Sequence, residues 1–238
     1  MSGRFHIVGD IHGCVRELET LLAGLDVSAG DTLAFIGDYI DRGPDSRAVV
    51  DLLLDLRAQS GLRTIFLKGN HEDMCLAYVG REGRWGEAWR MNGGGATLRS
   101  YGVSEALQGA AVAEGFPVEH LEFFESLDLT ALVDEFLLVH AGVRPSLPLD
   151  AQDPEDLLWI REEFIACAHE LPHTIVFGHT PQRQVLVDLP YKIGIDTGCV
   201  YGGRLTALEP REGVVHQVAY GDRQVRRLPL PRPRVARA

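Results

Sequence analysis

The sequence predicts an α/β fold in which parallel strands are joined by helices. In the first third of the 238-residue chain, short apolar runs alternate with stretches where apolar residues recur at helical spacing. Strands that alternate with helices in this way imply a parallel sheet. The last three apolar runs follow one another without a long helix between them, which indicates mixed pairing in a second sheet.

The first strands and helices are the most regular part of the pattern. An apolar run that ends at Gly9 is followed by an amphipathic helix, and the unit then repeats. The second helix is expected over about residues 46–59, with Asp45 or Ser46 as its N-cap. The strands are expected over residues 5–8, 32–36 and 64–67.

Residues from about 80 to 134 interrupt this alternation. Three consecutive glycines, Gly93 to Gly95, indicate a turn, and a helix is expected after Pro117. We expect a largely helical cap inserted over one rim of the sheet. The positions expected to face inward on its helix are Val118, Leu121, Phe124 and Leu127.

Strand-type runs return after the cap and end before an arginine-rich terminus. They cover residues 136–139, 174–177, 191–195, 205–208 and 214–219. Residues 223–238 hold six arginines and three prolines with almost no core-forming periodicity, so we expect a tail there. No linker divides the rest, which predicts a single catalytic domain over residues 1–222.

Composition excludes several classes of function. The formal charge of -11 opposes non-specific binding to nucleic acid or to an anionic membrane, so neither is expected as a partner. No apolar run approaches the length of a membrane span or of a signal-peptide core. The four cysteines are widely spread and form no C-x-x-C pair, which favours reduced thiols and a cytoplasmic protein.

Side chains of the kind that bind metals follow the predicted strands. Each lies just past the carboxyl end of a strand, and that edge is where open α/β sheets bind ligands. Delivered by five loops to one edge, the six donors can hold two divalent ions. The donors are Asp10, His12, Asp38, Asn70, His140 and His179.

Ligand chemistry narrows the choice of metal. Asp38 is suited to bridge the two ions, because each of its carboxylate oxygens can face a different ion. With no cysteine in the set, Mn, Fe or Zn is favoured over a metal that prefers thiolates. We expect Mn, with Fe or Zn as alternatives. A single histidine at the end of a strand would not predict a metal site. The six donors, which occur in order after five strands, do predict one.

The ordered motifs resemble those of the phosphoprotein phosphatase branch of the calcineurin-like metallophosphoesterases. The resemblance runs from Phe5 to about Leu208 and is strongest to bacterial and phage serine/threonine protein phosphatases. It implies two mixed sheets packed face to face and flanked by helices. The motifs are Gly9-Asp10-Ile11-His12-Gly13, Gly37-Asp38-Tyr39-Ile40-Asp41-Arg42-Gly43, Gly69-Asn70-His71-Glu72, His140-Ala141-Gly142 and Gly178-His179.

The resemblance also implies the role of each metal ligand. It places Asp10 and His12 on one ion, Asn70, His140 and His179 on the other, and Asp38 on both. A hydroxide that bridges the ions would attack phosphorus in line with the leaving oxygen. His71 resembles the general acid of the family, held in one tautomer by Asp41, and donates a proton to the leaving alkoxide.

Phosphate binding is assigned by the same resemblance. Arg42 and Arg161 match the family's phosphate-binding arginines, whose planar guanidinium groups can contact two phosphoryl oxygens at once. Asn70 is expected to lie against the phosphate as well as a metal ion. Lys68 stands where many relatives carry another arginine, which leaves a point charge instead of bidentate contact.

The resulting prediction is a metal-dependent phosphomonoesterase that acts on phosphoserine and phosphothreonine proteins or on a small phosphoester. The alternative is a hydrolase of dinucleoside polyphosphates or nucleotides on the same metals. Such relatives tend to lack the Asp41-Arg42 pair, which favours monoesters. The third hypothesis is a catalytically inactive binding module that keeps the fold. The physiological substrate and the oligomeric state stay open.

Histidines outside the motifs are given no function by the sequence. An isolated histidine is usually a core or surface residue, and that interpretation is preferred for all five. They are His6, His120, His169, His173 and His216.

Overall fold

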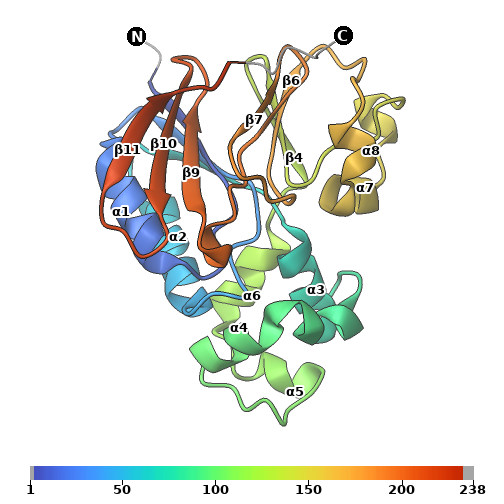
Figure 1. Cartoon of the computed structure of the whole chain (residues 1–238). Helices are drawn as coiled ribbons and strands as arrows, with labels where there is room; N and C mark the ends of the chain where they lie inside the picture. The colour runs from blue at the N-terminus through green and yellow to red at the C-terminus, as the bar shows by residue number, and fades with distance from the viewer. Residues whose placement is uncertain (1–2, 233–238) are drawn as a thin grey trace.

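Two mixed β-sheets packed face to face form the centre of the structure, a computed structural model that describes residues 3–232. Helices cover the outer face of each sheet, so the upper part of the molecule has four layers (Figure 1). This arrangement confirms the predicted fold class. None of the helices in the described part of the chain is long and apolar enough to cross a membrane.

The first sheet has six strands in the order β11-β10-β9-β1-β2-β3. Strands β1, β2 and β3 are parallel, whereas β9, β10 and β11 add to β1 in antiparallel fashion. The bounds are β1 Phe5–Val8, β2 Thr32–Phe35, β3 Arg63–Phe66, β9 Arg204–Glu209, β10 Val214–Ala219 and β11 Val225–Pro229.

The second sheet has five strands in the order β4-β5-β6-β8-β7. Strands β5, β6 and β8 are parallel, and the edge strands β4 and β7 are antiparallel to their neighbours. The bounds are β4 Thr130–Val133, β5 Phe136–Val139, β6 Thr174–Phe177, β7 Leu186–Asp188 and β8 Lys192–Gly194.

Three apolar layers hold the sheets and helices together. Alternate side chains of β1, such as Phe5 and Ile7, pack between the sheets, and Val8 faces the helices α1 and α2. A third layer, which includes Phe164, fills the space between the second sheet and the helices α7 and α8. The bounds are α1 Val15–Leu25, α2 Ser46–Ala58, α7 Pro154–Trp159 and α8 Glu162–Ile165.

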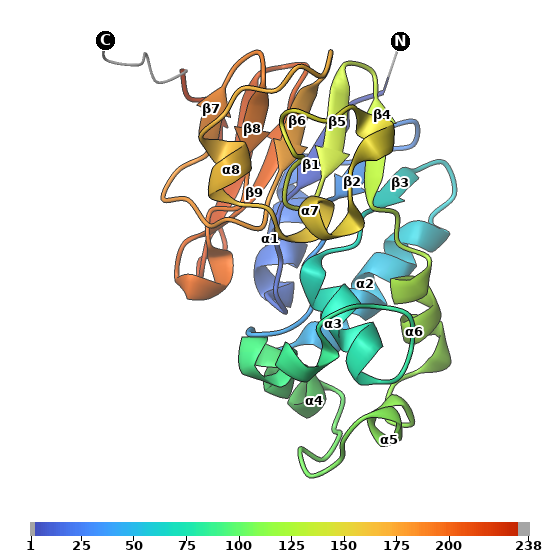
Figure 2. The same cartoon turned by 90° about the vertical axis from the view of Figure 1, so that its right-hand side faces the viewer.

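The remaining helices form a separate layer below the sheets, beside the carboxyl ends of the parallel strands (Figure 2). Helix α3 begins directly after the loop that follows β3, so its first residue, Asn70, lies at this edge. The bounds are α3 Asn70–Tyr78, α4 Gly95–Ser100, α5 Ala110–Ala113 and α6 Val118–Glu125.

Register sets the level at which the functional loops begin. Val8 lies beside Phe35, and Phe35 beside Phe66, so the first three parallel strands end together. In the second sheet Leu138 lies beside Val176. The loops after β1, β2 and β3 therefore start at one edge of the first sheet, and the loops after β5 and β6 start at one edge of the second. Hydrogen bonds between His140 and Ile36 and between His179 and Asp10 join these two edges.

Three sequence predictions differ from the structure. The predicted cap extended to residue 134, but residues 130–133 form β4, whose pairing with β5 the local sequence did not indicate. The predicted tail contains β11, which pairs with β10 although four of its five residues are exposed. Residues 233–238 of that tail lie outside the described residues. Val118 was expected inside but is exposed, because it opens α6, and Phe123 is buried instead.

Candidate metal centre and active site

The six predicted ligands meet at the shared edge of the two sheets. Asp10 follows β1, Asp38 follows β2 and Asn70 opens the helix after β3. His140 and His179 follow β5 and β6 of the other sheet. All six side chains, including that of His12, are almost fully buried. The parallel register of two separate sheets therefore produces one cluster from segments as far apart in sequence as residues 10 and 179.

Asp38 lies at the centre of this cluster. Its Oδ2 is 3.4 Å from Nε2 of His12, and its Oδ1 is 3.4 Å from Nε2 of His140. The two carboxylate oxygens thus face histidines on opposite sides. Such a division is what a carboxylate shared between two metal ions requires.

Asn70 connects the histidines of the second sheet. Its Oδ1 lies 3.0 Å from Nε2 of His140 and 3.1 Å from Nδ1 of His179. The backbone N–H of His179 donates to the carboxylate of Asp10 at 3.0 Å, which joins this group to the first loop. Asp10, Asp38 and the histidines therefore belong to one continuous site.

The tautomers of two histidines are set by the backbone. Nδ1 of His12 donates to the carbonyl oxygen of Ile40 at 2.8 Å, and Nδ1 of His140 donates to that of Ile36 at 2.9 Å. A ring that donates through Nδ1 carries a lone pair on Nε2. Both Nε2 atoms face Asp38, so both rings present a metal-binding nitrogen to the centre.

Strained backbone is concentrated at this edge. Eight non-glycine residues in the described part of the chain have positive φ, and five of them are predicted site residues. Each such residue costs of order 1–3 kcal/mol and persists where the surroundings hold it. The five are His12, Asp38, Asp41, Arg42 and His179.

Two motif glycines allow the loops to approach one another closely. A Cβ on Gly178 would lie 2.0 Å from Oδ1 of Asp10, and one on Gly69 would lie 2.2 Å from Oδ1 of Asp38. Any other residue would displace these carboxylates. The glycines are therefore needed for the placement of both carboxylates.

Glu72 fixes the loop that carries Asp38. Its carboxylate accepts hydrogen bonds from the backbone N–H groups of Asp38, Tyr39, Ile40 and Gly69, at 2.8 to 3.2 Å. One buried side chain thus joins the loop after β2 to the start of α3. The sequence prediction assigned no role to Glu72, although this residue is the last of the Gly69-Asn70-His71-Glu72 motif.

His71 and Asp41 form the predicted pair. Nδ1 of His71 lies 2.6 Å from Oδ2 of Asp41, and both side chains are fully buried. Nε2 of His71 is 3.9 Å from Oδ2 of Asp38 and has no hydrogen-bond partner among residues 3–232. The ring is therefore held at one end, and its other nitrogen faces the centre.

Asp41 is held in turn by residues of the helical layer. Thr97 donates to its Oδ1 at 2.6 Å, and Nε1 of Trp89 donates to its Oδ2 at 2.9 Å. Ser46 lies 2.9 Å from the hydroxyl of Thr97 and accepts from the backbone N–H of Asp41. No sequence motif pointed to Trp89 or Thr97, because both are more than 45 residues from Asp41.

The predicted phosphate-binding arginines differ in their surroundings. Arg42 is half-buried, with Nη1 donating to Nε2 of His12 at 2.5 Å and its guanidinium 5.6 Å from the ring centre of Tyr201. Arg161 is exposed, and its charge acts on His140 and His179. Both guanidinium groups thus lie at the rim of the centre. Lys68 instead pairs with Asp73 at 3.9 Å.

The electrostatics of the cluster favour neutral imidazoles beside an ionised carboxylate. Burial lowers the pKa of His12 to about 3 and also lowers the pKa values of His140 and His179. Burial alone would raise the pKa of Asp38, but the surrounding histidines outweigh it and hold that pKa well below its usual range. For His71, Asp38 and Asp41 outweigh burial and raise the pKa.

The acidic groups indicate that the cluster is built for cations. Burial, together with the charges of Asp196 and Asp38, raises the pKa of Asp10 well above its usual value. Burial raises the pKa of Asp196 to about 6, and the charge of Asp38 adds to this. Like charges so crowded are costly unless cations lie between them. Nε2 of His179 is also buried without a partner among the described residues. The donors therefore fit divalent metal ions.

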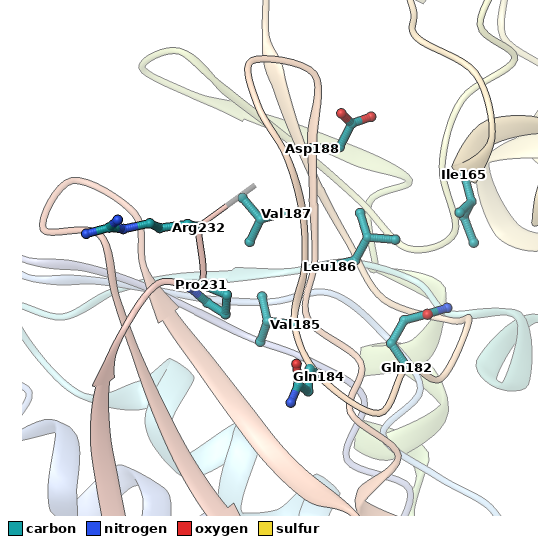
Figure 3. A pocket seen from close by; sticks show the side chains of 9 residues that line it. All are labelled: Ile165, Gln182, Gln184, Val185, Leu186, Val187, Asp188, Pro231 and Arg232. Carbon is teal, nitrogen blue, oxygen red and sulfur yellow. The ribbon is translucent and has the colours of Figure 1, made fainter. Parts of the chain in front are cut away.

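A separate hollow lies away from this cluster (Figure 3). It is lined by side chains around β7 and by Pro231 and Arg232 near the end of the described chain. Its one carboxylate, Asp188, pairs with Lys192 at 3.8 Å. The hollow contains none of the predicted site residues, and we assign no chemistry to it.

Comparison with known families agrees with the geometry. The profile of the family described as calcineurin-like phosphoesterase matches residues 3–222. Curated relatives include the asymmetrical bis(5'-nucleosyl)-tetraphosphatases PrpE of Anoxybacillus flavithermus and of Bacillus anthracis. These are 29% and 28% identical, and each comparison covers 86% of this chain and 89% of the relative.

Solved structures that resemble this chain include two phosphatases. The crystal structure of a protein assigned as a candidate diadenosine tetraphosphatase has a TM-score of 0.71 and 28% identity. It covers 92% of this chain and 94% of that protein. A cold-active protein-tyrosine phosphatase of a Shewanella species has a TM-score of 0.61 at 18% identity, covering 96% and 81%, and supports the fold alone. The curated names favour the dinucleotide alternative over the protein phosphatase expected from the motifs.

Proposed function

The chain belongs to the calcineurin-like phosphoesterase family, and on that basis we propose that it hydrolyses bis(5'-nucleosyl) tetraphosphates asymmetrically. The observation that carries the proposal is the likeness to named tetraphosphatases along almost the whole chain, at 28 to 29% identity. The buried His and Asp cluster supports metal-dependent hydrolysis, which is common to this proposal and to the monoesterase hypothesis.

Two divalent ions are proposed as cofactors. Asp10 and His12 would hold one ion, Asn70, His140 and His179 the other, and Asp38 would contact both. When bound, the ions supply positive charge that polarises the phosphoryl group and makes water acidic. The ligand set accepts Mn, Fe or Zn, and we propose Mn. Arg42 would then leave Nε2 of His12, since a metal ion takes the same lone pair.

The arginines would bind the phosphate chain. Arg42 and Arg161 lie at the rim on different loops, so they can contact phosphoryl oxygens from two sides. The amide of Asn70 is proposed to contact the reacting phosphate as well. As charge spreads over the equatorial oxygens in the transition state, these donors strengthen their hold.

The reaction needs little from a proton donor when the substrate is a dinucleotide. The oxygen of water bonds to phosphorus, the anhydride P–O bond breaks, and the leaving phosphate oxygen keeps the electron pair. A phosphate leaving group has a pKa near 6, so it departs as an anion. Nε2 of His71 would assist it with a hydrogen bond.

Hydrolysis of phosphomonoesters, including phosphoserine and phosphothreonine, is the second candidate. The observation that favours it is the 2.6 Å contact between His71 and Asp41. An alkoxide leaving group is strongly basic and has to be protonated as it departs, which is the task of a buried and oriented imidazole.

The deciding experiment compares kcat/KM of the Mn-loaded protein on three substrates. These are bis(5'-adenosyl) tetraphosphate, a phosphoserine or phosphothreonine peptide, and a phosphotyrosine peptide. The ratio of kcat/KM values reports differential transition-state binding directly. We expect the dinucleotide to lead. A phosphopeptide in the lead would transfer the proposal to the monoesterase, and turnover of none of them, nor of an aryl phosphate, would indicate a silent binding module.

A further inference from the structure

A second group of side chains that could coordinate a metal ion lies outside the centre described above. His6 of β1, Glu209 of β9 and His216 of β10 are all buried, and their ligand atoms lie within 4.8 Å of one another. The sequence prediction gave both histidines no role, because neither belongs to a motif. The three side chains come from three adjacent strands of the first sheet.

The strand register explains how these side chains meet. Ile7 lies beside Leu208, so the preceding residue, His6, lies next to Glu209. His216 lies beside Ala207, two positions along β9 from Glu209. Residues two apart on a strand share a face, and Val8 and Ala207 pack in the apolar layer with α1. The triad therefore points toward α1, at the end of the sheet where β1 begins.

His6 is the unexplained member of the group. It is 1% exposed, and neither ring nitrogen has a hydrogen-bond partner among residues 3–232. Leaving a buried donor or acceptor unsatisfied costs about 1–3 kcal/mol, so such a group in a core is unusual. Burial lowers the pKa of His6, which leaves the imidazole neutral with a lone pair available at neutral pH.

The distances fit a metal ion. Nε2 of His216 lies 3.3 Å from Oε2 of Glu209. Two ligand atoms at 2.0–2.1 Å from a tetrahedral zinc ion are about 3.3 Å apart. The ring of His6 meets that of His216 edge to face, with 6.0 Å between their centres. His6 is thus placed to supply the third ligand, beside Glu209 and His216.

We propose that His6, Glu209 and His216 bind one divalent cation of the zinc class. Two imidazole nitrogens and one carboxylate oxygen are a donor set that zinc accepts, whereas calcium and magnesium prefer oxygen ligands and would find only one here. A cation bound there would join three neighbouring strands. His6 precedes Asp10 by four residues, about 13 Å along an extended chain, so the site is separate from the catalytic centre.

The test counts bound zinc. Purified protein is stripped with a chelator, dialysed against buffered zinc and analysed for metal per chain. We expect the wild type to bind one more equivalent than His6→Asn or Glu209→Gln, with the affinity of the lost site reduced at least roughly 100-fold. The control His173→Asn removes a histidine that belongs to no ligand group in the described chain and should bind as the wild type does. Equal zinc content in all four proteins would overturn the proposal.

A second measurement keeps the test decisive if those variants fail to fold. The double variant Asp38→Asn/His140→Asn weakens the catalytic centre and leaves the triad unchanged. Titrated with cobalt, it should give the visible bands of a four-coordinate ion at one equivalent, and added zinc should remove them. Adding Glu209→Gln should abolish the bands. Their absence from the double variant, or their persistence after that addition, would contradict the triad site.

Discussion

Nδ1 of His71 lies 2.6 Å from Oδ2 of Asp41, and the same oxygen accepts the indole N–H of Trp89 at 2.9 Å. The pair is fully buried, so Asp41 has no bulk water to satisfy it and depends on protein donors. This contact fixes one nitrogen of His71 and leaves the other facing the predicted metal ligands. The two proposed reactions need different things from His71: an alkoxide leaving group has to receive a proton, whereas a phosphate leaving group departs as an anion.

Replacing His71 with asparagine should separate substrates by their leaving group. Hydrolysis of an alkyl phosphate should slow about 10²–10⁴-fold, because its leaving oxygen needs a proton. The loss should be much smaller for an aryl phosphate and for the dinucleotide, whose leaving groups depart as anions. Metal analysis should show unchanged content. An equal loss on all three substrates would rule out the general-acid role.

Replacing Trp89 with phenylalanine should loosen Asp41 without changing any of the predicted metal ligands. Loss of a hydrogen bond to a charged group lowers the free energy of unfolding by about 1.5–3 kcal/mol. Alkyl phosphate hydrolysis should fall more than aryl phosphate hydrolysis, since only the former relies on an oriented His71. Denaturant unfolding and kcat on both substrates measure these effects. The exposed Trp85, changed to phenylalanine, serves as the control; if the two variants behave alike, Trp89 does not position Asp41.

Replacing Arg161 with alanine should weaken phosphate binding. Loss of a charge-assisted hydrogen bond of about 1.5–3 kcal/mol corresponds to a rise of roughly 10- to 100-fold in the inhibition constant of inorganic phosphate. Arg161 is exposed and caps only the short α8, so stability should change little. Steady-state inhibition measures the constant. An unchanged value would exclude Arg161 from the phosphate site.

Tyr201 offers a test of the dinucleotide proposal. Its side chain is 61% exposed beside the guanidinium of Arg42, which leaves a ring face at the rim for a nucleobase to stack on. Stacking of a base on an aromatic side chain contributes about 1–3 kcal/mol. Tyr201→Ala should therefore raise KM for the dinucleotide at least several-fold and leave KM for an aryl phosphate unchanged. Leu132→Ala, which shortens an exposed apolar side chain on the edge strand β4, is the control.

Asp38→Asn should impair both proposed metal positions together. The amide keeps the shape of the side chain but supplies only one oxygen, so it cannot serve two ions as a carboxylate does. We expect lower metal content and a loss of activity on every substrate, measured by metal analysis and kcat. Chelation of the wild type should have the same effect and be reversed by Mn. Full activity of the variant would refute the central position of Asp38.

The order of the strands, and of the predicted metal ligands that follow them, could be inferred from the sequence because both depend on short-range signals. An apolar run followed by a side chain that can bind a metal recurs five times, with a glycine between the two in four of the five cases. The carboxyl ends of parallel strands in turn must meet at one edge of a sheet. This reasoning places Asp10, Asp38 and His140 at the same edge, where the structure also has them. The sequence predicts Asp45 or Ser46 as the N-cap of α2, and in the structure it is the carboxylate of Asp45 that accepts the N–H of Ala48.

Other features depended on contacts between distant segments. Thr97 and Trp89 hold Asp41 from the helical layer. His6 meets His216 only because β1, β9 and β10 are neighbouring strands. Residues 225–229 form a strand only because the edge of β10 is available for pairing. Local sequence carries no signal for such pairings, since their energy comes from the partner. Substrate choice is of the same kind. The two proposed hydrolases would use the same predicted metal ligands, so selectivity would depend on rim residues that the tertiary fold brings together.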